Sequence, residues 1–310
     1  ILLQSGAGPR MDVNAVVSLH APCQFRTFLN QRRPPPFAPS YSNKIAQFDS
    51  MSPTFSWPDD DDAPWARSMN EKRTKSAHHS SGPPSRRWWI SVPEARARQE
   101  ALRSSVVTED ALPTVRSVAG VDVGVSRRRG RVRAAAAQFT VTASAATTLA
   151  LDASSVAVRP LDFPYVPGYL SFRELPALRA ALENLPRRPD LILCDGHGFA
   201  HPRRFGLACH LGVELDIPTI GVAKKRFIGD YREPAQTRGA CEELVDDGEV
   251  IGAVVRTRVG VKPIFVSIGH RVTLETAVQW TLACTTRYRL PETTRAADHL
   301  AAFPPLSAPR

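Results

Sequence analysis

The apolar positions of this chain become periodic only after its first tens of residues. A helical spacing of apolar residues over Glu94–Val107, opened by Pro93 in its first turn, predicts a helix. Alternation of apolar with polar or small residues then predicts three consecutive strands. They are expected at Val115–Val125, Arg131–Val141 and Thr147–Arg159.

After this three-strand opening the pattern changes to alternating helices and short buried strands. The predicted units are a helix over Ser171–Leu185, a strand at Leu191–Cys194, a helix over Phe205–Leu215 and a strand at Thr219–Val222. Two further strands (Val250–Thr257 and Ile264–Ile268) and two further helices (Thr273–Cys284 and Thr293–Ala302) complete the set. The order predicts an α/β domain, with a meander followed by βα units around a central sheet.

The segment before this domain lacks sustained periodicity and contains an acidic run, Asp59–Asp62, and a Ser/Pro/Arg-rich stretch, Ser80–Arg87. Such a composition buries too little apolar surface to offset the entropy of ordering. We therefore expect a disordered extension or artefact over residues 1–87, the folded domain over 88–304 and a short tail over 305–310. A basic arm that binds nucleic acid is the functional alternative for the extension, and we favour an extension without a role.

The charge balance points to a polyanionic partner. The chain has 310 residues, a formal net charge of +10 and a pI near 9.8, which favours nucleic acid, although a basic tail would give the same total. Five cysteines without a CxxC pair suit a reduced compartment, and we expect the cytoplasm. No apolar run is long enough for a membrane span, and no signal peptide is evident.

Two carboxylates stand on predicted buried strands. Asp195 ends the strand Leu191–Cys194 and opens into the glycine turn at Gly196, while Asp122 lies within the first strand. Two unpaired buried carboxylates are costly unless they bind a cation. Because hard oxygen ligands suit Mg²⁺ or Mn²⁺, Asp122 and Asp195 are candidate metal ligands; an exposed strand end is the alternative for either one.

The other candidate residues are ambiguous on pattern alone. Ser171 and Glu174 have the spacing of a helix capping box, which would explain both without any chemistry. His270 ends a predicted strand as Asp195 does, but a satisfied polar residue is the commoner explanation. Lys224 follows a strand and is able to hold a phosphate charge, although a solvated strand end is the usual case.

Two loops suit a nucleic-acid substrate. The run His201–Arg204 presents cations for a phosphodiester backbone. A loop stiffened by Pro164 and Pro167 presents Tyr165, and an aromatic side chain on such a loop can enter a base stack. A conformationally fixed connection between strand and helix is the structural alternative.

At these residues the chain closely resembles the endonuclease V family, the deoxyinosine 3′-endonucleases. The resemblance runs from about Ile90 to Ala302 and rests on the order and spacing of several segments. These are VAGVDVGV, PYVPGYLSFRELPAL, PDLILCDGHGFAHPRRFGLACHLG, DIPTIGVAKKR and IFVSIGHRVTLETA.

The resemblance implies a ribonuclease H-like fold and a Mg²⁺-dependent endonuclease, with Mn²⁺ as a substitute. It further implies that the protein cuts DNA at the second phosphodiester bond 3′ to deoxyinosine and leaves a 3′-hydroxyl and a 5′-phosphate. We expect a monomer with inosine-containing DNA as its partner. A ribonuclease acting on inosine in RNA is the alternative, and a protein that binds inosine without cutting is a weaker one.

Site residues are implied by the same resemblance. Asp122 and Asp195 correspond to the metal-binding acids, and Glu174 to a third catalytic acid, which displaces the capping interpretation. His270 corresponds to an active-site histidine and Lys224 to a lysine near the scissile phosphate. The wedge that replaces the displaced base corresponds to Pro164, Tyr165, Val166 and Pro167, and the hypoxanthine pocket to Gly168, Leu170, Gly196 and His201.

Overall fold

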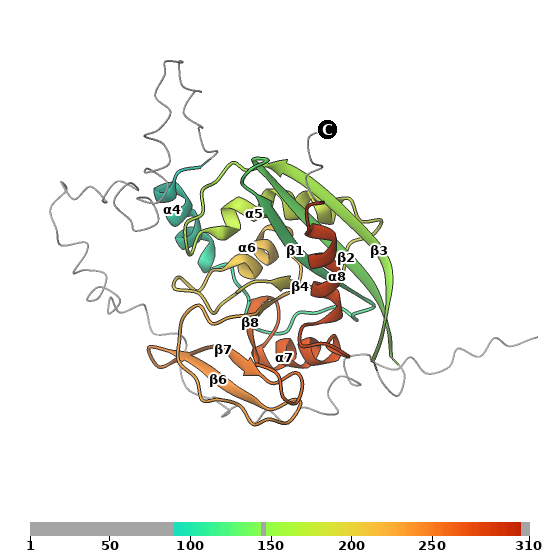
Figure 1. The fold of residues 1–310 in the computed structure, drawn as a ribbon. Helices are drawn as coiled ribbons and strands as arrows, with labels where there is room; N and C mark the ends of the chain where they lie inside the picture. The colour runs from blue at the N-terminus through green and yellow to red at the C-terminus, as the bar shows by residue number, and fades with distance from the viewer. Residues whose placement is uncertain (1–89, 144–146, 305–310) are drawn as a thin grey trace, which may run out of the picture. The chain divides into compact units, whose positions relative to one another are not determined.

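The computed structural model describes residues 90–143 and 147–304 (Figure 1). The extension expected at residues 1–87 and the tail at 305–310 lie outside the described residues, so the domain boundaries stay a prediction. Within the described residues, no helix is long and apolar enough to cross a bilayer.

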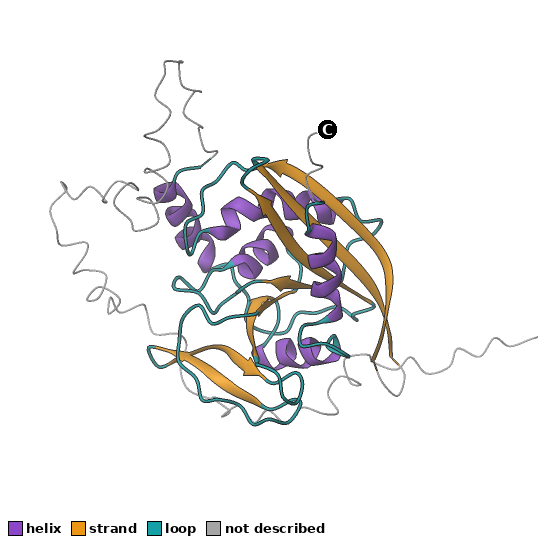
Figure 2. Ribbon diagram, viewed as in Figure 1, coloured by secondary structure: helices purple, strands orange, loops and turns teal. Residues whose placement is uncertain are grey.

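In the described part of the chain, eight strands form one sheet in the order β3-β2-β1-β4-β5-β8-β7-β6 (Figure 2). The predicted strands are all present, within a few residues of their expected bounds. The strands are β1 (Ser117–Ser126), β2 (Arg131–Ala143), β3 (Thr147–Pro160), β4 (Leu191–Asp195), β5 (Thr219–Ala223), β6 (Cys241–Asp246), β7 (Glu249–Val255) and β8 (Ile264–His270).

The directions of the strands confirm the expected fold class. β1, β2 and β3 pair antiparallel as a meander, whereas β1, β4 and β5 are parallel neighbours. β8 runs antiparallel to β5 and joins it to the β6–β7 hairpin. This is the mixed sheet of a ribonuclease H-like fold, flanked by helices on both faces.

Strand β6 is the one described strand that the sequence pattern did not predict. Half of its six residues, CEELVD, are charged, and only Leu244 is fully buried. The hairpin turn is nevertheless encoded locally, because Asp247 (φ 50°) and Gly248 (φ 79°) both adopt the left-handed conformation of a tight two-residue turn.

The described residues contain five helices. They are α4 (Val92–Arg103), α5 (Leu170–Glu183), α6 (Leu207–Leu215), α7 (Leu274–Ala283) and α8 (Glu292–Ala301). In Figure 1, α5 and α6 lie on one face of the sheet, and α8 crosses β1 and β2 on the other.

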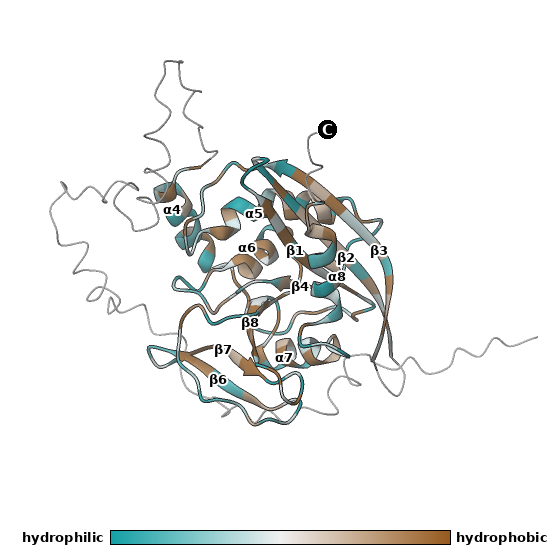
Figure 3. Ribbon diagram, viewed as in Figure 1, coloured by the Kyte–Doolittle hydropathy of each residue, from teal (hydrophilic) through white to brown (hydrophobic). Residues whose placement is uncertain are grey.

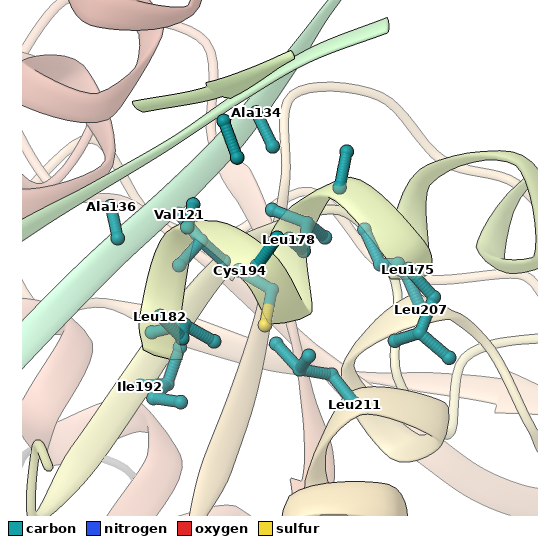
Figure 4. Packing of buried hydrophobic residues seen from close by; sticks show 14 of the residues in the cluster. Val121, Ala134, Ala136, Leu175, Leu178, Leu182, Ile192, Cys194, Leu207 and Leu211 are labelled. Carbon is teal, nitrogen blue, oxygen red and sulfur yellow. The ribbon is translucent and has the colours of Figure 1, made fainter. Parts of the chain in front are cut away.

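The core between the sheet and α5 and α6 is aliphatic. Figure 4 shows Leu178 and Leu211 packed against Val121 of β1 and Cys194 of β4, and these four side chains are essentially inaccessible to solvent. Cys194 therefore has the core position that the sequence predicts, and Cys209 is buried as well. In the hydropathy colouring of Figure 3, apolar residues recur along both of these helices.

Helix α5 does not use the predicted capping box. Its first residues have no side-chain cap, and Ser171 lies inside the helix with its Oγ 3.0 Å from Nδ1 of His210. A capping box does occur at α4, where the Ser91 backbone N–H donates to the Glu94 carboxylate (2.8 Å) and the Glu94 backbone N–H donates to the Ser91 Oγ (3.4 Å). Glu174 is therefore free of the structural role that its spacing suggested.

Candidate active site

Two of the predicted acids lie side by side on the central strands β1 and β4. Val121 of β1 pairs with Cys194 of the parallel strand β4, which puts Asp122 and Asp195 at the same level on neighbouring strands. Because Val121 and Cys194 point into the core under α5 and α6, the next residue on each strand points to the opposite face.

A third carboxylate, Asp298 of α8, completes this cluster. One oxygen atom from each of Asp122, Asp195 and Asp298 lies within 4.8 Å of the other two. The sequence pattern did not identify Asp298, because a polar residue on an amphipathic helix carries no sign of the strand that the helix crosses. The only feature of the sequence that bears on Asp298 is the helical pattern of Thr293–Ala302, which predicts the helix but not its contact with β1.

The crowded acids change one another's protonation. Burial, together with the charge of Asp195 and a hydrogen bond that Asp122 donates to Asp298, raises the pKa of Asp122 to about 7. Burial also raises the pKa of Asp195, although the Lys224 ammonium works against it. The shared hydrogen bond lowers the pKa of Asp298, so Asp122 holds the proton between the two.

Glu174 projects from α5 into the same cavity as Asp122 and Asp195. Burial raises the pKa of Glu174 to about 8, and the charges of the two aspartates add to this rise while Arg173 opposes it. A carboxyl group with its pKa near neutrality beside a cluster of acids is typical of a group that exchanges protons in catalysis.

Lys224 follows β5 and contacts the acids directly. Its Nζ lies 2.5 Å from Oδ2 of Asp195 and 3.4 Å from Oδ1 of Asp298. These carboxylates raise the pKa of the lysine against the effect of burial. The structure thus places a permanent cation at the rim of the acidic cluster.

A cavity of about 380 Å³ opens beside the acids. Most of the residues predicted for substrate binding line it, and it brings the loop before α5 together with the turn after β4. The predicted residues along its wall are Asp122, Tyr165, Pro167, Gly168, Leu170, Glu174, Asp195, Gly196 and His201.

The carbonyl oxygen of Gly168 links the loop before α5 to helix α4 and to the loop after β4. It accepts hydrogen bonds from Gln99 (3.0 Å), His201 Nε2 (3.0 Å) and Arg203 (2.7 Å). Gly168 itself has φ +82°, a conformation that favours glycine. Because Nε2 of His201 donates to this carbonyl while its Nδ1 accepts from the backbone N–H of Arg203, the ring has one fixed neutral tautomer, and burial lowers the pKa of His201 to about 3.

The predicted wedge divides into an exposed and a packed part. Tyr165 is 57% exposed, with the Arg173 guanidinium 5.6 Å from its ring centre. Val166, by contrast, packs against a cluster that contains Phe163 and Phe172. Tyr165 is thus the aromatic side chain of this loop that is available to a ligand.

The residues of the cavity wall that were not predicted include two aromatic ones, His197 and Phe227. The ring of Phe227 lies 5.9 Å from that of His197 and 5.6 Å from that of His201, centre to centre. Burial lowers the pKa of His197 to about 4. These rings give the cavity an uncharged aromatic side that suits a flat base.

The structure does not bring His270 to the acids. Strand β8 runs antiparallel to β5, and His270 pairs with Thr219, the first residue of β5, at the edge opposite Asp195. Both ring nitrogens of His270 have polar partners away from the acids. Nδ1 accepts a hydrogen bond from the backbone N–H of Val107 (3.2 Å), and Nε2 lies 3.5 Å from Oδ1 of Asp216. The prediction of a catalytic role for His270 is not supported.

The donor set of the cluster fits a divalent cation. Asp122, Asp195 and Asp298 offer only carboxylate oxygens, the ligands that hard cations such as Mg²⁺ and Mn²⁺ prefer. Their mutual repulsion, which adds to burial in raising the pKa of Asp122, is relieved when a cation lies between them.

Comparison with known proteins places this site in a family. The endonuclease V family matches residues 100–299. An endonuclease V of Roseiflexus sp. (strain RS-1) is 54% identical over 214 residues, which cover 69% of this chain and 93% of that protein.

Solved structures give the same result. The crystal structure of the endonuclease V of Streptomyces avermitilis is 49% identical, with a TM-score of 0.65 over 69% of this chain and 92% of that one. Endonuclease V of Ciona intestinalis, crystallised with a 23mer DNA containing an inosine followed by a ribo-adenosine, is 29% identical with a TM-score of 0.58, covering 68% and 97% of the two chains. The fold, the acidic cluster and these matches together establish that the chain belongs to the endonuclease V family.

Proposed function

We propose that this protein is a Mg²⁺-dependent endonuclease that cuts DNA at the second phosphodiester bond 3′ to deoxyinosine and leaves a 3′-hydroxyl and a 5′-phosphate. The observation that carries the proposal is the convergence of Asp122, Asp195 and Asp298 beside a cavity that Glu174 also lines. Mn²⁺ is expected to substitute for Mg²⁺.

The acids and the lysine divide the chemistry between them. Asp122, Asp195 and Asp298 would hold the divalent ion, which when bound neutralises charge on the phosphate and lowers the pKa of an attacking water. Glu174 orients this water and accepts its proton, in line with the near-neutral pKa of its carboxyl group. Lys224, 2.5 Å from Asp195, neutralises the charge that builds up on the phosphate in the transition state.

Selectivity for the deaminated base would come from the cavity. Moving a base out of the stack costs a few kcal/mol, less when the base is mispaired, and Tyr165 would fill the vacated space. Gly168, Leu170, Gly196 and His201 line the cavity, where the neutral His201 has one fixed tautomer and the ring of Phe227 lies 5.6 Å away. These groups suit the hydrogen-bonding edge and the flat face of hypoxanthine.

Cleavage of a labelled oligonucleotide with a single deoxyinosine tests the proposal. We expect one cut at the second bond 3′ to the lesion, dependent on Mg²⁺ and abolished by Asp195→Asn. Binding without metal-dependent cleavage would instead indicate an inosine-binding protein, and full activity of the Asp195→Asn protein would refute the metal assignment.

The preference between DNA and RNA is a separate outcome of the same assay. The Ciona complex contains a ribonucleotide directly after inosine, so a hybrid of that design belongs beside matched all-DNA and all-RNA strands. The proposal predicts the fastest cleavage for the DNA strand, whereas faster cleavage of the RNA or hybrid strand would make this protein a ribonuclease.

A further inference from the structure

Two glycines flank Asp122 on β1 and face helix α8. Residues 120, 122 and 124 alternate with the core residues Val121 and Val123, so they share the face on which α8 lies. A Cβ on Gly120 would lie 2.0 Å from the carbonyl carbon of Thr293. A Cβ on Gly124 would lie 2.3 Å from the carbonyl oxygen of Ala301. The backbone of α8 therefore occupies the space that side chains at these positions would fill.

The distance between the two contacts is nearly the same along the strand and along the helix. Four strand residues from Gly120 to Gly124 span about 13 Å, and eight helical residues from Thr293 to Ala301 span about 12 Å. The helix thus runs along β1 and touches it at both glycines. Asp298 lies between the two contact points of the helix, as Asp122 lies between the two glycines of the strand.

The end of α8 is also held from the neighbouring strand. Arg133 of β2 is the cross-strand partner of Gly124, and its Nε donates to the carbonyl oxygen of Leu300 at 2.9 Å. This bond fixes the last turn of the helix at the same level as the second glycine contact.

We propose that Gly120 and Gly124 are positioning residues of the divalent-metal site, because they let α8 approach β1 closely enough for Asp298 to join Asp122 and Asp195. The inference rests on the proposed function of these acids as metal ligands. Groups that orient ligands without contacting the metal typically change its affinity by 10- to 100-fold.

The test measures metal binding to the full chain directly, by titration calorimetry with Mn²⁺ in the absence of nucleic acid. We expect Gly124→Ala and Gly120→Ala to weaken Mn²⁺ binding by roughly tenfold or more. Gly252→Ala is the matched control, because its Cβ would lie 2.6 Å from the backbone oxygen of Val266 in a remote part of the sheet. This control should lose stability and keep its Mn²⁺ affinity.

A double-mutant cycle separates positioning from general destabilisation. If the glycines act through Asp298, adding Gly124→Ala to Asp298→Asn weakens Mn²⁺ binding no further than Asp298→Asn alone. Additive losses, or an unchanged affinity in folded Gly124→Ala protein, would overturn the inference.

A second variant keeps the inference testable if the alanine variants do not fold. Arg133→Met removes the bond to Leu300 without filling either glycine position, and it should weaken Mn²⁺ binding severalfold; an unchanged affinity counts against the inference. Failure of the proposed function has a different signature, since the wild-type chain would then show no saturable Mn²⁺ binding.

Discussion

At the scale of single residues, Asp122 shows how burial and neighbouring charge act together on one carboxyl group. Its pKa of about 7 and that of Glu174, about 8, lie well above those of unfolded chains, about 3.9 for Asp and 4.3 for Glu. The folded protein therefore keeps protons that the unfolded chain has already released.

This difference predicts how stability depends on pH in the absence of metal. Unfolding releases protons, so the free energy of unfolding should fall as the pH rises from about 4 to about 8, and Mg²⁺ should restore it at pH 8 by binding the ionised acids. Thermal melts in EDTA and in Mg²⁺ at pH 5 and pH 8 measure this. Asp122→Asn protein should show a weaker dependence on pH, and an equal dependence would contradict the assignment.

Glu174 allows a prediction that separates catalysis from stability. Glu174→Gln keeps the volume of the side chain but removes the proton acceptor, so cleavage should fall by about 10²–10³-fold. Below pH 8 the melting temperature should change little, because burial raises the pKa of Glu174 to about 8 and its carboxyl group is then mostly uncharged. Single-turnover cleavage and thermal melting measure the two effects. Glu183→Gln, at the exposed end of the same helix, is the matched control and should cleave normally.

At the scale of secondary-structure elements, the direction of a strand decides which edge of the sheet its last residue reaches. Asp195 and His270 both end buried strands, and this local similarity is all that a single sequence displays. Since β4 and β5 are parallel whereas β8 is antiparallel to β5, the two residues lie at opposite edges. The sequence pattern could therefore predict that Asp195 lies at the site, but it could not predict that His270 lies away from it.

The strands and helices themselves follow closely from the pattern, because apolar alternation and helical spacing report local burial. Asp298 depends instead on a long-range crossing of α8 over β1, which no local period encodes. Glu174 was ambiguous for a related reason, since the spacing of Ser171 and Glu174 fits a cap that the helix, beginning one residue earlier, does not form.

The structure assigns His270 a stabilising role, which leads to an opposite prediction for its substitution. His270→Ala should lower the free energy of unfolding by about 0.5–1.5 kcal/mol, because the part-buried hydrogen bond that Nδ1 accepts from the N–H of Val107 is lost. Cleavage below the melting temperature should stay within about twofold of wild type. Urea unfolding combined with the oligonucleotide assay checks both, and a loss of activity in stably folded protein would return His270 to the catalytic group.

At the scale of the whole molecule, the formal charge of +10 sets the expected response to salt. Each phosphate that the protein neutralises contributes a slope of about −0.9 to the dependence of log K on log salt concentration for duplex DNA. Affinity for an inosine-containing duplex should therefore fall by at least about tenfold between 50 and 200 mM salt.

Fluorescence anisotropy with Ca²⁺ in place of Mg²⁺ measures this affinity. The matched duplex without inosine should show a similar slope, because backbone contacts carry no sequence information. A binding constant that does not change with salt would contradict a phosphate-dominated interface.

The position of Asp298 late in the chain has a consequence for biosynthesis. The ribosome adds residues from the amino end, so all eight strands are made before α8. On the proposed function, a nascent chain at that stage displays the sheet with two of its three metal-binding acids. The hydrolytic centre is thus assembled only when α8, which is made after all of the described strands, docks on β1.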